Sequence, residues 1–242
     1  MKRRECGLQR AMVFVCLLIS LVFCGAVAFA EEESPVIDAT RRWLYQVTEG
    51  SAAIVGYTIK PVGALIIPDT VDGYAVKGIG NGAFSYCYGI TSVTLPNSLT
   101  HIGDAAFEWC ISLTRVNLPA GVTNIGVNPF AHSRLTHINV SASNPVYAQI
   151  DGVLFHKQQR MLVSYPSVRK GSYTIPNGVR RVGDRAFNGC IGLTAITLPE
   201  RLTHIGDAAF DGCIGLTGIT VTEGSYAEEY VQGKGLAYVV DK

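Results

Sequence analysis

Apolar and polar positions repeat with a fixed period along most of this chain. Each unit alternates apolar and polar residues up to a Leu-Pro or Ile-Pro pair, and then continues to Ile-Gly or Val-Gly and to a phenylalanine. The phenylalanines are 23 residues apart within each of two series, Phe84, Phe107 and Phe130, and then Phe187 and Phe210. The residues before proline form a second column in step with the first, at Leu95, Leu118, Ile175 and Leu198. Two columns in phase indicate a tandem structural repeat.

Residues 113–135 illustrate what one unit predicts. Leu113 to Leu118 alternates apolar and polar residues, which is typical of a short strand with one buried face. Pro119 ends that strand because it has no N–H to donate. Val122 to Ile125 predicts a second short extended piece, Gly126 allows a sharp turn, and the next residues suit a single helical or 3₁₀ turn. One unit cannot bury its apolar side alone, so neighbouring units must stack at about 4.8 Å, the usual spacing of strands.

The predicted fold is therefore a repeat solenoid, a β-rich right-handed coil with short 3₁₀ or helical turns on its convex side. We expect repeats over residues 64–140 and 173–221, and the first is lengthened by Asp69–Tyr74. Residues 141–172 interrupt the period, and Gly152–Phe155 and Met161–Val163 predict a β-hairpin around a polar turn.

Both ends of the coil need caps, because exposed strand edges invite aggregation. Within residues 31–63, Trp43–Val47 and Ala52–Val55 predict an N-terminal capping hairpin. Within residues 222–242, Ser225 with Glu228 three residues later is a capping-box signature for a short helix, and a strand at 236–240 follows.

The repeat unit resembles that of the BspA-like (TpLRR-type) leucine-rich repeats of bacteria. In that class a strand of the form LxxIxLP is followed by xxLxxIGxxAFxxC, and five units match from about residue 64 to residue 221. The insert, with its NPxY-like start and DGVLF segment, is also similar to inserts in that class. The resemblance implies a leucine-rich-repeat fold in a secreted or cell-surface protein. It also implies binding to host matrix proteins, mucosal surfaces or other microbes.

The first thirty residues have the order of a secretory signal peptide. Lys2, Arg3, Arg4 and Arg10 are followed by an apolar run that ends in Ala28-Phe29-Ala30, which predicts cleavage after Ala30. A retained membrane helix is the alternative, although only glutamates follow the run. The residues before Cys24 are too large for lipoprotein processing. We expect a secreted, extracellular protein, and a cell-surface or periplasmic location stays open.

The net charge and the hydropathy of the chain argue against two kinds of partner, nucleic acid and the membrane interior. The whole chain has a net charge of +1, and removal of residues 1–30 leaves the remainder near −2. No basic stripe is present, which argues against a nucleic-acid partner. A second apolar span is also absent from the sequence, so the mature chain should not cross a membrane.

The four cysteines outside the signal segment each lie three residues after a phenylalanine of the repeat. This phase predicts small buried core residues at Cys87, Cys110, Cys190 and Cys213. Disulfides between adjacent turns are an alternative that a secreted location would permit. A metal or catalytic site is a further alternative, but no CxxC pair supports it.

Other polar residues that could carry chemistry follow the repeat. His101 and His204 share one repeat position and should be exposed. Asp104, Asp184 and Asp207 should cap the turn that begins at each of them rather than bind calcium. The adjacent His132 and Ser133 superficially suggest a base and a nucleophile, but no acidic partner follows in a recognisable motif. We therefore predict no catalytic residue, no metal and no cofactor.

The outward positions of the predicted strands remain as the candidate contact surface. Their most distinctive part is Arg115, Asn117, His137 and Asn139, and the alternative is a plain solvated β face. The predicted contact face comprises Thr94, Arg115, Asn117, His137, Asn139, Thr174 and Thr197, and the predicted rim comprises Phe155, His156 and Tyr165. The function expected is extracellular binding of a protein or glycan without catalysis. A structural spacer or display antigen is the alternative, and an enzyme a remote one.

Overall fold

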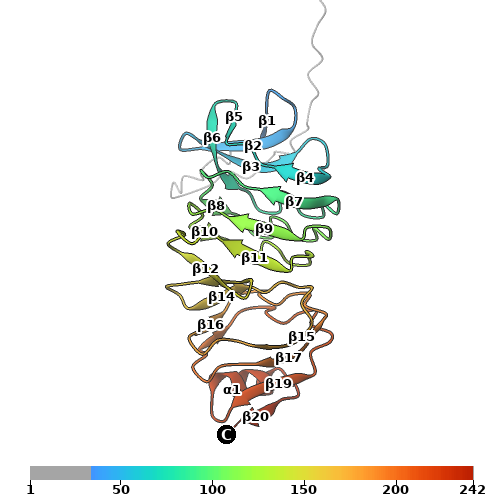
Figure 1. The fold of residues 1–242 in the computed structure, drawn as a ribbon, viewed down its shortest axis with the longest axis vertical. Coiled ribbons are helices and arrows are strands. Elements are labelled where there is room, and N and C mark those ends of the chain that lie inside the picture. The colour runs from blue at the N-terminus through green and yellow to red at the C-terminus, as the bar shows by residue number, and fades with distance from the viewer. Residues whose placement is uncertain (1–33, 242) are drawn as a thin grey trace, which may run out of the picture. The chain divides into compact units, whose positions relative to one another are not determined.

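The computed structural model describes residues 34–241, so the predicted signal segment lies outside the described residues. Within this range the chain forms a stack of β turns with one short helix near its C-terminal end (Figure 1). The strands form four sheets, and most neighbouring strands in them come from successive turns. The predicted repeat solenoid is therefore confirmed.

An antiparallel hairpin covers the N-terminal end of the stack. β2 (Trp43–Thr48) pairs with β3 (Ser51–Tyr57), and β1 (Val36–Ile37) adds to the outer edge of β2. On its other edge β3 pairs in parallel with β6 (Tyr74–Ile79). The residues that lengthen the first repeat form β5 (Thr70–Val71), which pairs antiparallel with β6. The hairpin thus leads from antiparallel pairing into the parallel pairing of the turns.

The following turns give longer strands to one parallel sheet and short strands to another. The longer strands are β4 (Gly63–Ile66), β7 (Ile90–Thr94), β9 (Arg115–Leu118) and β11 (His137–Val140), and the short strands are β8 (His101–Ile102) and β10 (Asn124–Ile125). Val93 pairs with Val116, and Ile79 pairs with Ile102, so apolar residues of successive turns form columns in the interior.

The bends after the short strands form a third ladder, which we call the bend ladder. The N–H groups of Gly82, Phe84 and Tyr86 donate to carbonyls of the next turn, at residues 104, 106 and 108, each at 2.8 Å. The predicted helical turns are present here as single turns closed by hydrogen bonds three residues apart, such as Ser85 N–H to the Gly82 carbonyl at 2.9 Å. Left-handed residues, with φ of +60° at Gly82 and +58° at Tyr86, prevent a continuous helix.

The insert forms the predicted hairpin and one further strand. β12 (Tyr147–Ile150), β13 (Val153–His156) and β14 (Met161–Ser164) pair antiparallel in chain order. β14 then pairs in parallel with β16 (Arg181–Val182), which pairs with β18 (His204–Ile205). The hairpin therefore begins a new sheet of short strands for the later turns.

The second set of longer strands ends at the C-terminal cap. It comprises β15 (Gly171–Thr174), β17 (Leu193–Thr197), β19 (Gly218–Thr222) and β20 (Val239–Asp241). Between β19 and β20 lies α1 (Tyr226–Gly233). Ser225 caps this helix as predicted, because the Glu228 N–H donates to Ser225 Oγ at 3.2 Å. The Glu228 carboxylate accepts from the Gly224 N–H at 2.7 Å, one residue before the position that a capping box would use.

The insert also divides the interior into two apolar cores, one before it and one after it. Leu154 and Val163 of the hairpin pack into the first core, whereas Val153, Phe155 and Leu162 pack into the second. The hairpin is consequently buried on both faces, like a central strand of a parallel sheet.

Polar contacts tie the two sets of turns together beside the hairpin. Asn128 is buried, its Nδ2 donates to the Arg185 carbonyl at 2.6 Å, and its Oδ1 accepts from Ser164 Oγ at 2.7 Å. The Arg185 guanidinium also pairs with the Glu108 carboxylate. These contacts replace the regular pairing that the insert interrupts.

Candidate binding surfaces

The distinctive residues of the predicted contact face lie together on two adjacent strands. Arg115 and Asn117 are on β9, His137 and Asn139 are on β11, and the register pairs Arg115 with His137 and Asn117 with Asn139. All four side chains are exposed. We call these four residues the strand-face patch.

Hydrogen bonds order part of the strand-face patch and leave part of it open. Asn139 Nδ2 donates to Asn117 Oδ1 at 2.9 Å, and His137 Nδ1 lies 3.2 Å from Thr136 Oγ1. Within residues 34–241 the Arg115 guanidinium forms no ion pair and no side-chain hydrogen bond. The patch therefore offers a free cation beside two aligned amides.

A groove of about 540 Å³ adjoins the amides of the strand-face patch. Polar residues of the loops after the strands contribute to its lining, namely Asn97, Ser141 and Ser143 beside Asn117 and Asn139. We call this the amide groove. Its loop residues were not predicted from the sequence because they lie beyond the alternating strand pattern, although Asn97 directly follows one of the repeat prolines.

The rest of the predicted contact face belongs to two different sheets. Thr94 is exposed on β7, beside the strand-face patch, whereas Thr174 on β15 is exposed and Thr197 on β17 is half-buried. The Asp151–Gly152 turn of the hairpin takes the position after β11, and the Gly152 carbonyl accepts from the Ile138 N–H at 2.9 Å. A continuous face from β7 to β19 is therefore not formed.

The predicted rim is wrong for two of its three residues. Phe155 is 6% exposed and Tyr165 is 4% exposed, because the hairpin lies between the two cores instead of projecting from them. His156 is half-buried beside Tyr147, with ring centroids 5.2 Å apart. Burial lowers the pKa of His156, which keeps its ring neutral near pH 7.

The repeated phenylalanines and cysteines line the interior, and only their last members, Phe210 and Cys213, are half-buried. Their buried members are Phe84, Phe107, Phe130, Phe187, Cys87, Cys110 and Cys190. All four cysteines are free thiols. Cys110 Sγ donates to the Phe84 carbonyl at 3.2 Å, and burial raises the pKa of Cys110 to about 12. Such a thiol stays protonated and is a poor nucleophile.

The recurring acidic residues cap a neighbouring turn, so the prediction that each caps its own turn is wrong for Asp104 and Asp184. Asp104 Oδ1 accepts from the Val127 N–H at 2.8 Å, and Asp184 Oδ1 accepts from the Asp207 N–H at 2.9 Å. The glycine of each Ile-Gly pair makes room for this contact. A Cβ on Gly126 would lie 2.1 Å from Asp104 Oδ1.

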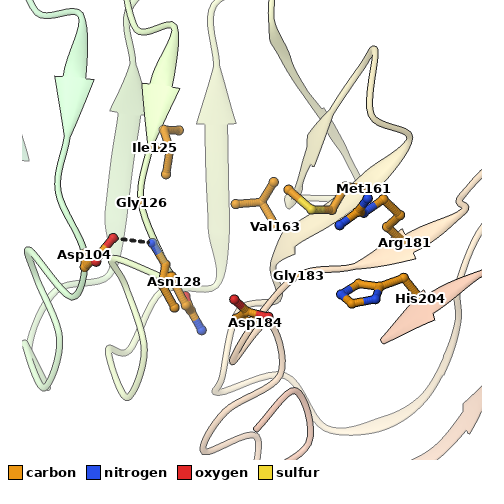
Figure 2. A pocket seen from close by; sticks show the side chains of 11 residues that line it. Asp104, Ile125, Gly126, Asn128, Met161, Val163, Arg181, Gly183, Asp184 and His204 are labelled. Carbon is orange, nitrogen blue, oxygen red and sulfur yellow. Dashed lines mark hydrogen bonds between the residues drawn. The ribbon is translucent and has the colours of Figure 1, made fainter. Parts of the chain in front are cut away.

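A pocket of about 270 Å³ marks the junction between the two sets of short strands (Figure 2). Asp104 and Asn128 come from the earlier turns, while Asp184, Arg181 and His204 come from the later ones, as Figure 2 shows. Asp104, Asp184 and Asn128 already hold structural hydrogen bonds. His204 is exposed, as predicted for its repeat position, and His101 is half-buried. The pocket's polar side chains are thus largely engaged in joining the turns.

A second groove, of about 500 Å³, lies at the bends on either side of the insert. Its lining includes Trp109, Ile111 and His132 of the earlier turns, and Lys170 and Ile191 beyond the hairpin. We call it the edge groove. From the sequence, His132 suggested only a possible base, and Trp109 was not predicted to take part in a site.

Three further observations on the described residues concern metal binding, catalysis by His132 and Ser133, and membrane-spanning helices. Among residues 34–241 no three His, Cys, Asp or Glu side chains come together so as to hold a metal ion. His132 stacks on Trp109, with centroids 4.1 Å apart, instead of activating Ser133. No helix in the described range is long and apolar enough to cross a membrane.

The stacked parallel turns, the phenylalanine and leucine columns and the exposed strand face define a leucine-rich-repeat solenoid. The model of the BspA type leucine rich repeat region matches residues 69–160 and 165–231 in six copies, so the chain belongs to that family. No curated protein matches the chain.

Solved structures to which the chain is similar come from several bacteria. The pneumococcal vaccine antigen PcpA is 19% identical with a TM-score of 0.50, over 78% of this chain and 72% of that one. The leucine-rich-repeat protein of T. pallidum is 22% identical with a TM-score of 0.44, over 84% and 82%. A leucine-rich cell surface protein of Faecalibacterium prausnitzii is also 22% identical, with a TM-score of 0.44, over 79% and 83%.

Proposed function

We propose that this chain is a secreted binding protein without catalytic activity, and that its strand-face patch binds an extracellular protein or glycan. Membership of the BspA-type repeat family supports a non-catalytic repeat protein. Solenoids commonly bind partners through the strand faces and loop inserts of their turns. The predicted signal segment supports export.

The observation that carries the proposal is the contrast at equivalent positions between β9 and β11 and the later strands; β7 of the earlier set carries small residues too, Ser92 and Thr94. On β9 and β11 these positions hold Arg115, Asn117, His137 and Asn139. On the later strands they hold small residues instead, namely Ser172, Thr174, Ala195, Thr197, Gly218 and Thr220. Because the later strands pair in parallel at these same positions, the fold does not require large polar side chains here.

The adjoining amide groove favours a hydroxyl-rich or peptide-like ligand over an apolar one. Asn117, Asn139 and Asn97 each offer both donors and acceptors, and Ser141 and Ser143 add hydroxyls. Arg115 can form paired hydrogen bonds with a carboxylate or sulfate on the same ligand. The surface therefore suits a glycan with an acidic group or a polar segment of a matrix protein.

The test compares binding of the purified protein with immobilised matrix proteins, mucin and a glycan array. Arg115→Ala with His137→Ala should weaken saturable binding by about tenfold or more, because such changes remove central contacts. The matched control is Ser172→Ala with Thr174→Ala on β15, which should leave binding unchanged. Circular dichroism and the melting temperature should be the same for all three proteins.

Unchanged binding in the Arg115 and His137 double variant would contradict the proposal for this patch. If the wild-type protein shows no saturable partner in any format, the alternative role as a spacer or display antigen is favoured. Binding that is lost equally in the control variant would place the contact on the later turns.

A further inference from the structure

One position of the bend is left-handed in every turn, whichever residue occupies it. It lies two residues after the repeated phenylalanine and has φ of 55° to 59° at Tyr86, Trp109 and His132, and 73° at Gly189 and Gly212. A residue with a side chain is strained by roughly 1 kcal/mol or more in this conformation, whereas glycine is not. Since two turns fold with glycine at this position, the backbone does not need the aromatic side chains of the other three.

These three aromatic side chains form a stack outside the core. The rings of Tyr86 and Trp109 lie 6.3 Å apart and 8° from parallel, and those of Trp109 and His132 lie 4.1 Å apart and 7° from parallel. Tyr86 is 49% exposed and Trp109 is 37% exposed. The stack ends over Gly189, where a Cβ would lie 2.3 Å from His132 Nδ1. A row of flat side chains therefore leads to the edge groove.

The wall of the edge groove is mostly apolar. Trp109, Ile111, Val168 and Ile191 contribute its apolar lining. Ile111 is 44% exposed and Ile191 is 64% exposed, so the structure leaves large apolar side chains facing solvent around a hollow. Such a hollow suits an inserted apolar side chain, because it removes apolar area from water on both partners.

The charged residues that line the groove are both basic. Arg134 and Lys170 line it, and no Asp or Glu does. The neighbouring Glu108 is held by Arg185, and among residues 34–241 that is the one ion pair formed. The bend ladder also stops at the groove, because within the described residues the N–H group of His132, which lines the groove, donates to no backbone carbonyl. The two cations favour a carboxylate on the partner.

We propose that the edge groove binds a protein partner through a segment in which an aromatic or long aliphatic side chain lies beside an Asp or Glu. The apolar side chain fills the hollow between Trp109 and Ile191, and the carboxylate pairs with Arg134 or Lys170. A neutral glycan fits poorly, since its hydroxyls would be desolvated against an apolar wall that has few hydrogen-bonding groups. This contact is separate from the strand-face patch and does not depend on the function proposed for it.

The test uses the fluorescence of Trp109, because Trp43, the other tryptophan of the chain, is 5% exposed and packed in the core. The probe is a short peptide in which Phe and Leu alternate with Asp and Glu. Its counterpart has Lys in place of every acidic residue. Vesicles of phosphatidylcholine are a third probe. The acidic peptide should shift Trp109 emission saturably and bind at least about tenfold more tightly than the Lys peptide, and added salt should weaken it.

Two variants test the residues of the groove, and a third serves as their control. Trp109→Gly installs the residue that the later turns use, so the fold should be kept while affinity for the acidic peptide, measured by fluorescence polarisation of a labelled peptide, falls about tenfold or more. Arg134→Glu with Lys170→Glu should reverse the preference towards the Lys peptide. The control Lys77→Glu with Arg201→Glu changes net charge equally on exposed positions away from the groove and should change affinity little.

Equal affinity for the two peptides, or no binding of the acidic one, would overturn the proposal. So would a Trp109 response to vesicles alone, which would indicate a lipid surface, or an affinity that survives Trp109→Gly. The strand-face double variant should bind the acidic peptide as the wild type does, so failure of one proposal is distinguishable from failure of the other.

Discussion

The turns before the insert and the turns after it have nearly the same interior. Phe84 and Phe107 stack with centroids 5.3 Å apart, and Phe187 and Phe210 stack at 5.2 Å. The thiol of the later turn donates to the phenylalanine carbonyl of the turn before it in both sets, at 3.2 Å from Cys110 and 3.1 Å from Cys213. The core and the backbone of the repeat are therefore copied almost without change.

The exteriors of the two sets differ at matching positions. Where the earlier turns place Trp109 in the bend and Arg115 on the strand, the later turns place glycine and alanine, at Gly189 and Ala195. The later turns act as an internal reference for what the scaffold needs. We assign binding to the side chains that are larger or more polar than the residues at the matching positions of the later turns.

The largest expected effect tests whether the copied interior is equally important along the stack. Phe107→Ala should destabilise the protein by about 3–5 kcal/mol, because Phe107 is fully buried between Phe84 and Phe130. Phe210→Ala should cost clearly less, since Phe210 is half-buried in the last turn next to Tyr230 of α1. Urea unfolding of both variants measures the difference in the free energy of unfolding. Equal decreases for the two variants would contradict the expectation that the interior contributes less to stability in the last turn.

A smaller effect tests the junction between the two sets of turns. Asn128→Ala should cost about 2–3 kcal/mol, because Ser164 Oγ and the Arg185 carbonyl lose their partner in a buried place. Ala105→Asn changes the matching left-handed position of the previous turn and should alter stability by less than about 0.5 kcal/mol.

Unfolding of the Asn128 variant should be followed by both far-ultraviolet dichroism and tryptophan emission. We expect the transition to broaden or divide, because each set of turns has its own core. A sharp single transition at the wild-type midpoint would show that Asn128 does not couple the two sets.

The smallest effect concerns the left-handed bend position itself. Gly212→Tyr should destabilise by about 1–2 kcal/mol, since φ is 73° and a Cβ would lie 3.2 Å from the Gly189 nitrogen. Tyr86→Gly should change stability by less than about 1 kcal/mol, because relief of strain offsets the lost ring contact with Trp109. Thermal unfolding compares the pair, and a larger loss for Tyr86→Gly would make the aromatic stack a stabilising element.

The repeated interior was predictable because its physical requirements are local and periodic. The phenylalanine and leucine columns and the glycine of each Ile-Gly pair recur at fixed spacing, so the solenoid and the hairpin followed from the sequence. Phe155 and Tyr165 were misplaced because a hairpin in an insert was taken to have an outer face. The unbroken apolar run Val153-Leu154-Phe155 in fact signals burial on both faces.

The candidate sites were less predictable because they depend on neighbours that are distant in the sequence. Arg115 and His137 could be paired by counting along the repeat. The edge groove instead requires that Trp109 lie near Lys170 and Ile191, which only the path of the insert determines. Aligning the residue two after each phenylalanine would have exposed the contrast between Trp109 and Gly189.

The hydrogen bonds of the bend ladder all point the same way along the coil, which gives this side of the coil a net dipole. Its N–H groups point towards the following turn and its carbonyls towards the preceding one, so the peptide dipoles along one side add instead of cancelling. The ladder is interrupted at the insert, and the earlier turns therefore present a partly positive end inside the molecule, at Phe130 and His132. The insert thus does more than interrupt the repeat, because it leaves the His132 end of the ladder beside Arg134 and Lys170 of the edge groove.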